Sequence, residues 1–203
     1  MFIKVPIFKK LLKQAFAADR MKVKMDESGL TVDCIHFAVW FEREHIPNKI
    51  KSAIVELAGE IPEEGKAFLA QKSGNQYEMD SAALDARSAF RQTDKRYVQT
   101  PIVYSDDYDT YRFLQMAGKT DNIKLVADIF IQLLDPHELD FSAAEGTIQG
   151  PYGTENGTMF FWATDLCILA VGAIVPHRGI VKKTMLELAD IDFEGDYSGL
   201  EER

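Results

Sequence analysis

The sequence contains little of what marks several protein classes. Its 203 residues include only two cysteines, Cys34 and Cys167, which give neither a disulfide framework nor a Cys-x-x-Cys motif, so we expect a reducing, cytoplasmic environment. The longest clean apolar run, Cys167–Val175, has nine residues, whereas a helix that spans a bilayer needs about 20. We therefore predict no membrane association. The first ten residues, MFIKVPIFKK, also have no apolar core of a secretory signal.

Catalytic and metal-binding signatures are missing as well. No GxSxG, HExxH or GxGxxG motif occurs. The glycine-rich stretch 150–157 has no Lys-Ser/Thr after it and leads into an apolar strand, so it predicts a hairpin turn and not a phosphate-binding loop. The four histidines have no ligand spacing with one another or with the cysteines. We predict that the protein is not an enzyme and needs no cofactor or metal.

The acidic tail is the nearest approach to a metal motif. Residues 190–201 place carboxylates at positions 1, 3, 5, 7 and 12 and glycine at position 6, the oxygen-ligand spacing of a calcium loop. Glutamate at position 5, aromatic residues at positions 4 and 8, and the lack of room for an exiting helix are untypical. The pattern favours a solvated tail, and the sequence leaves calcium binding open.

Charge is spread unevenly along the chain. The 23 Lys and Arg against 32 Asp and Glu give a net charge of −9. Residues 1–24 hold seven basic residues and one acidic residue, Asp19, for +6, and the remaining 179 residues carry −15. An acidic body with a basic N-terminal element is typical of proteins that bind a charged partner.

Similar segments occur in the same order in both halves. Ile7–Leu12 (IFKKLL) matches Ile129–Leu134 (IFIQLL) at four of six positions. Further on, Ile46-Pro47 precedes an ELA segment by nine residues, and Val175-Pro176 precedes a second ELA by eleven. The order predicts an internal duplication, with the chance recurrence of common apolar residues as the alternative.

Hydrophobic periodicity predicts an α+β fold of helices on mainly antiparallel sheet. We expect four main helices, the third of them N-capped by Asp128, and a polar helix or connector at 80–96. The domains would be two clamp-like units, 1–80 and 97–203, of antiparallel sheet with two short helices each, joined by a connector at 81–96. The helices would cover 7–17, 48–58, 129–134 and the segment after Pro176, and the strands 2–5, 21–25, 30–34, 36–41, 67–71, 76–79, 97–104, 110–115, 123–126, 159–163 and 166–175.

The first half resembles a domain of the DNA sliding clamps, through its MF start, its lysine-bearing LLKQA helix and a strand pair that turns at ESGLTV. In that family two helices per domain line a central hole around duplex DNA, the lining is basic, and the whole protein is acidic. The resemblance implies a homo-oligomer, a trimer if two domains per chain form a closed ring. This chain departs from the pattern because each half is shorter, the helix at 129–134 carries no cation, and no strand pair follows the last helix.

Cations on three of the four helices are the candidate DNA-binding residues. We expect them to face one concave surface and to contact phosphates without sequence preference; they are Lys9, Lys10, Lys13, Lys49, Lys51, Arg178, Lys182 and Lys183. The function that follows is a non-enzymatic, clamp-like processivity or replication accessory factor of a phage or mobile element. Its partners would be double-stranded DNA and a polymerase or other replication proteins. The alternative is an acidic phage-type inhibitor or interaction protein that binds a host nucleic-acid-binding protein, with carboxylates that mimic phosphates.

Overall fold

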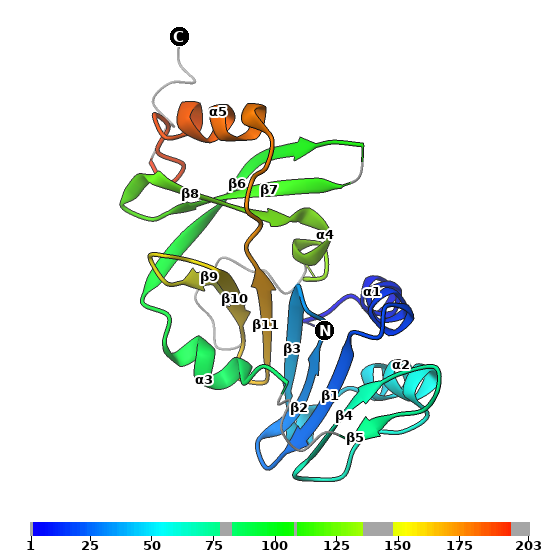
Figure 1. Ribbon diagram of the computed structural model, residues 1–203. Helices are drawn as coiled ribbons and strands as arrows, with labels where there is room; N and C mark the ends of the chain where they lie inside the picture. The colour runs from blue at the N-terminus through cyan, green and yellow to red at the C-terminus, as the bar shows by residue number, and fades with distance from the viewer. Residues whose placement is uncertain (1, 78–82, 108, 136–147, 196–203) are drawn as a thin grey trace.

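A computed structural model of the chain describes residues 2–77, 83–107, 109–135 and 148–195. Within these residues five α-helices lie against one large, antiparallel sheet, so the predicted α+β class is confirmed (Figure 1). The helices are α1 (Val5–Ala17), α2 (Asn48–Ala58), α3 (Ala86–Arg91), α4 (Asp128–Ile131) and α5 (Gly179–Leu188), with a short 3-10 turn, η1, at Arg43–His45.

The sheet has eleven strands in the order β5-β4-β1-β2-β3-β11-β10-β9-β6-β7-β8. Their bounds are β1 (Met21–Asp26), β2 (Gly29–Asp33), β3 (Phe37–Glu42), β4 (Lys66–Ala70), β5 (Gln76–Tyr77), β6 (Lys95–Ser105), β7 (Thr110–Met116), β8 (Lys119–Ala127), β9 (Gln149–Gly153), β10 (Met159–Ala163) and β11 (Cys167–Gly172).

The two halves of the chain meet in the middle of this sheet. β1, β2 and β3 form one antiparallel meander and β9, β10 and β11 form another, and β3 pairs with β11 over five residue pairs centred on Val39 and Leu169. Among the described residues, three strands lie between α1 and α2, and three lie between α4 and α5. Internal duplication and the domain boundaries at residues 80 and 97 stay predictions.

Helices cover both faces of the central sheet. α1, α2 and α4 lie on one face, where they enclose the main core; its fully buried members include Phe8, Leu12, Ile50 and Ile54 from α1 and α2. α3 covers the opposite face of β3, β10 and β11. There the guanidinium of Arg87 lies 4.9 Å from the Trp40 ring centroid.

The second half adds a layer that separates α5 from α1 and α2. One face of β7 and β8 joins the main core through Leu114 and Val126. The other face forms a smaller cluster, in which Phe113 and Leu125 pack against α5. In Figure 1, α5 accordingly lies beyond β7 and β8, on the far side from α1 and α2.

Local sequence explains where the first two helices begin and end. Pro6 lies in the first turn of α1, where a missing N–H costs nothing. α1 ends at Ala17; Asp19, two residues later, has a φ of +53, and the N–H of Arg20 donates to the Ala15 carbonyl. α2 follows Pro47 and ends at Gly59, whose φ of +79 suits a residue without Cβ.

Two local predictions are wrong. The strand expected at 2–5 is a single bridge from Ile3 to Leu134, because the helix already starts at Val5. Asp128 does not cap the helix at 129–134 through its side chain, and α4 ends at Ile131. Its carboxylate instead bonds to the Arg112 side chain, a tertiary partner that local sequence cannot reveal.

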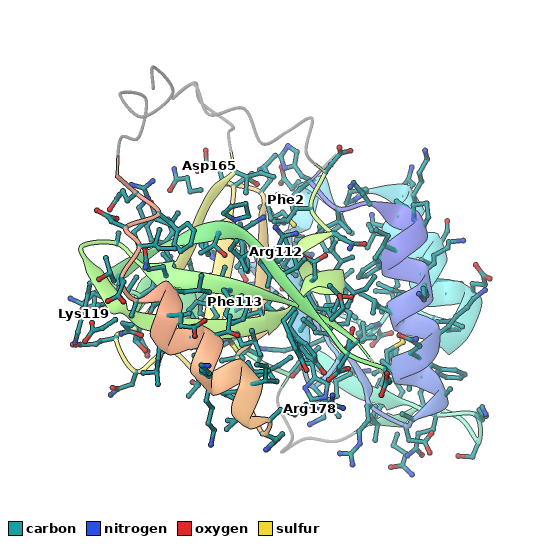
Figure 2. The ribbon with its side chains drawn as sticks, turned by 90° about the horizontal axis from the view of Figure 1, so that it is seen from above. Phe2, Arg112, Phe113, Lys119, Asp165 and Arg178 are labelled. Carbon is teal, nitrogen blue, oxygen red and sulfur yellow. The ribbon has the colours of Figure 1, made fainter. Side chains whose placement is uncertain are left out.

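The Arg112–Asp128 ion pair lies where β7, β8 and α4 meet (Figure 2). Arg112 Nε and Nη2 both lie 2.8 Å from Asp128 Oδ1, and Nη1 donates to the Thr100 carbonyl at 3.2 Å. Gln132 donates to the other carboxylate oxygen at 2.7 Å. Asp128 is only 4% exposed, so these donors replace the water that its carboxylate loses on burial.

Replacing Arg112 with methionine should lower the free energy of unfolding by about 3 kcal/mol, because the buried Asp128 carboxylate loses its charged partner. Urea denaturation measures the loss. The control is Lys119→Met, which breaks the exposed Lys119–Glu155 pair of 2.7 Å and should leave the urea midpoint nearly unchanged. Equal midpoints for the two variants would contradict this role for the buried pair.

Candidate nucleic-acid interface

Five of the eight candidate cations lie on two helices that pack side by side. α1 and α2 contact each other on one face of the sheet; we call residues 5–17 and 48–58 the α1–α2 layer. The layer carries five lysines and one glutamate, a net charge of +4, in a chain of net charge −9. Burial of the apolar stripes of both helices against the sheet turns their polar sides to solvent.

Glu56 is the one acidic group of this layer, and it bridges two of its lysines. Lys9 Nζ lies 2.8 Å from one carboxylate oxygen, and Lys13 Nζ lies 3.5 Å from the other. The hydrogen bond from Lys9 is the main cause of a Glu56 pKa below its usual value of 4.5, and the charges of Lys9 and Lys13 add to it. All three side chains are substantially exposed, so water screens the pairs and leaves the ammonium groups accessible.

The other three lysines of the layer differ in exposure. Lys10 and Lys49 are exposed, and Lys51 is half-buried. Lys49 also lines a shallow hollow of about 330 Å³ beside the start of α1, together with Lys4 and Asp135. The lysines of the layer therefore extend from the middle of α1 to the start of α2.

The three remaining cations lie elsewhere. Arg178 directly precedes α5; it hydrogen-bonds Tyr104, which raises the arginine's pKa, and its Nε lies 3.8 Å from Asp106. Lys183 lies 3.7 Å from Glu187 one turn along the helix, and Lys182 is exposed. In Figure 2, α5 and α1 are well apart in the view, with Arg178 next to the start of α5.

The eight candidate cations thus do not form the single concave surface expected from the sequence. The strands β7 and β8 lie between the two groups, because α5 packs on the outer face of these strands. The α1–α2 layer is the larger and more positive group. DNA binding by any of the eight residues stays a prediction.

Glu56 is the part of this site that the sequence analysis did not identify. In the sequence, Glu56 is notable only as the first residue of a repeated ELA segment. Its position on the polar side of α2, two turns after Lys49, was visible in the sequence. Its pairing with Lys9 and Lys13 depends on how α1 and α2, which three strands separate in the sequence, pack side by side on the sheet.

The described residues offer little support for metal or thiol chemistry. No group of three His, Cys, Asp or Glu side chains among them could hold a metal ion. Burial raises the pKa of both Cys34 and Cys167, which keeps these thiols protonated. The calcium-like loop at 190–201 lies partly outside the described residues. Nor does any described helix have the length and apolar character to cross a bilayer.

Comparison with known proteins gives one weak likeness of fold. No protein-family model matches the chain, and no curated protein matches it. Among solved structures it is similar to the beta subunit from DNA polymerase of Streptococcus pyogenes, with 8% identity and a TM-score of 0.35 over 89% of this chain and 66% of that one. The resemblance to the clamps is confirmed at this weak level. At such a score it supports no argument about function.

The Lys9–Glu56 contact gives a direct test of the layer's electrostatics. Replacing Lys9 with methionine should raise the pKa of Glu56 toward 4.5, because the strongest hydrogen bond to its carboxylate is removed. Titration of the Glu56 carboxyl by NMR measures the change. Lys10→Met is the control, since Lys10 is not among the groups that shift this carboxyl. A Glu56 pKa that moves equally in both variants would contradict the contact.

Proposed function

We propose that this protein is a non-enzymatic, DNA-associated protein that contacts duplex phosphates through the α1–α2 layer. The observation that carries the proposal is the net charge of +4 on two adjacent helices of an acidic protein. Lysines that approach the phosphate backbone release condensed counterions, and this makes binding favourable whatever the sequence. The acidic remainder of the surface would be repelled by DNA and would orient the molecule with this layer inward.

The arrangement of the lysines suits loose, movable contact. Lysine presents a point charge on a flexible stem and lacks the planar, bidentate geometry with which arginine fixes a phosphate or a guanine. α1 and α2 contain five lysines and no arginine. Contacts of this kind position a protein on the duplex without reading bases.

The wider role is part of the same proposal. We propose a cytoplasmic accessory factor of replication in a phage or mobile element, acting as a homo-oligomer and meeting a polymerase or other replication proteins on DNA. A trimer would form if the subunits close a ring. Sedimentation of the protein with and without a DNA circle distinguishes a trimer that encloses DNA from a monomer that binds along one side.

The first test removes the cations of α1. The triple variant Lys9→Met, Lys10→Met, Lys13→Met should weaken binding to a duplex of arbitrary sequence and flatten its salt dependence. For each lysine that no longer neutralises a phosphate, the slope of log K against log salt should fall by about 0.9. Fluorescence anisotropy over a salt series measures both. The matched control is Lys182→Met with Lys183→Met on α5, which should leave binding by the α1–α2 layer unchanged.

Glu56→Gln provides a test in the opposite direction. Removing the carboxylate deletes the one negative charge of the layer and releases Lys9 and Lys13, so affinity for the duplex should rise several-fold at low salt. The same anisotropy series measures this affinity.

If neither the triple variant nor Glu56→Gln changes DNA binding, the proposed interface is wrong. Retention of a basic nucleic-acid-binding protein, without any affinity for DNA, would select the inhibitor alternative.

A further inference from the structure

A second surface feature lies on the opposite face of the sheet from the α1–α2 layer. It is a partly enclosed hollow of about 350 Å³, at the end of the sheet near the α1–β1 loop. Its walls combine charged side chains, among them Arg20, Lys22 and Asp33, with apolar ones such as Ile35, Leu84 and Met159. The volume is in the range of small-molecule sites.

Lys22 is the cation with the most unusual surroundings here. It lies directly across from Asp33 in the β1–β2 register, where opposite charges normally pair. The Asp33 carboxylate is engaged elsewhere, since it accepts the N–H of Ile35 at 3.3 Å and that of Leu84 at 3.0 Å. No carboxylate within the described part of the chain forms an ion pair with half-buried Lys22.

The neighbouring Lys24 shows that a lysine on this strand can form an ion pair. Lys24 lies two residues further along β1, on the same face of the strand. Its ammonium group pairs with Asp26 at 3.1 Å, and it does not line the hollow. Lys22 therefore lines the hollow without an ion-pair partner in the described part of the chain, whereas Lys24 is paired.

Ile35 adds a strained backbone at the rim of the same hollow. Its φ is +62, a region that β-branched residues rarely adopt, and the N–H of His36 bonds to the Cys34 carbonyl at 2.7 Å across it. The side chain is 51% exposed, so burial in the core does not offset the strain. Strain of this kind is retained where surrounding structure imposes it, and it is frequent at ligand sites.

The remaining walls are partly apolar and partly charged. Leu69, Leu84 and Met159 reach the hollow from β4, the segment before α3, and β10. Arg20, from the loop after α1, is a second cation without an ion pair in the described chain. Of the two carboxylates, that of Asp33 is engaged by two N–H donors, and Asp19 lies exposed at the end of α1.

We propose that this hollow is a binding site for a small organic anion with an apolar body. Lys22 and Arg20 would hold the anionic group, and Leu69, Leu84, Met159 and Ile35 would cover the apolar part. The site is independent of the proposed DNA contact, because it lies on the other face of the sheet and shares no residue with the α1–α2 layer.

A matched pair of dyes tests the site. Anilinonaphthalene sulfonate is an apolar anion, and phenylnaphthylamine is nearly the same molecule without the charged group. We expect the sulfonate to bind with one-to-one stoichiometry, and Lys22→Met to weaken it about tenfold by removing a charge-assisted hydrogen bond. Lys24→Met, the control on the same strand, should leave its affinity unchanged. Phenylnaphthylamine should bind more weakly than the sulfonate and respond to neither change.

Ile35→Gly keeps the proposal testable if Lys22→Met folds poorly. Glycine adopts a positive φ without strain, so this variant should have a higher urea midpoint than the natural chain. It should bind the sulfonate several-fold more weakly, because an apolar wall is removed. Leu186→Ser controls for dye on the exposed apolar residues of α5 and should change nothing. Equal sulfonate affinity in Lys22→Met and Lys24→Met, or unchanged affinity in Ile35→Gly, would overturn the assignment.

Discussion

The antiparallel pairing of β3 with β11 is the contact on which the rest of the structure depends. It joins two three-stranded meanders into one sheet and thereby gives the helices of both halves a shared surface to cover. Both strands are buried on both faces, under α1, α2 and α4 on one side and α3 on the other. A polar residue at Val39 or Leu169, both fully buried, would disrupt layers contributed by both halves at once.

The separation of charge follows from the same layered arrangement. α1 and α2 bury their apolar stripes on one face of the sheet, so their lysines gather on the outer side of that face. β7 and β8 extend the sheet, and α5 covers them from the opposite side. Cations that occupy similar positions in the sequence of α1, α2 and α5 therefore lie on different surfaces of the molecule. The hollow lined by Lys22 lies on the other face of the sheet, so the sheet itself separates it from the α1–α2 layer.

Local signals in the sequence were sufficient for most of the secondary structure and for the α+β class. Pro47 before α2 and Gly59 after it mark that helix correctly, since proline and glycine act on their own backbone. Asp128 was assigned wrongly, because its partner Arg112 lies on another strand.

The candidate interface could be predicted only in part, because it too depends on contacts between distant segments. The lysines of α1 and α2 were identified individually, whereas Glu56 and the position of α5 depend on how distant segments pack. Lys22 was not among the candidate residues, because it has the pattern of an ordinary polar residue in an alternating strand. Only the structure shows that the carboxylate of its neighbour Asp33 is engaged by other donors.

The long sequence separation of the central pairing has a consequence for synthesis in the cell. β3 is complete at Glu42, and its partner begins at Cys167, about 125 residues later. At translation rates of about 5–20 residues per second, roughly 6 to 25 s pass before β11 leaves the ribosome. During that interval the apolar strand FAVWF is the open edge of a three-stranded meander, a template for pairing with other nascent chains. Chaperone capture of this edge, or slow and concentration-sensitive refolding, is the expected cost of building one sheet from two distant parts of the chain.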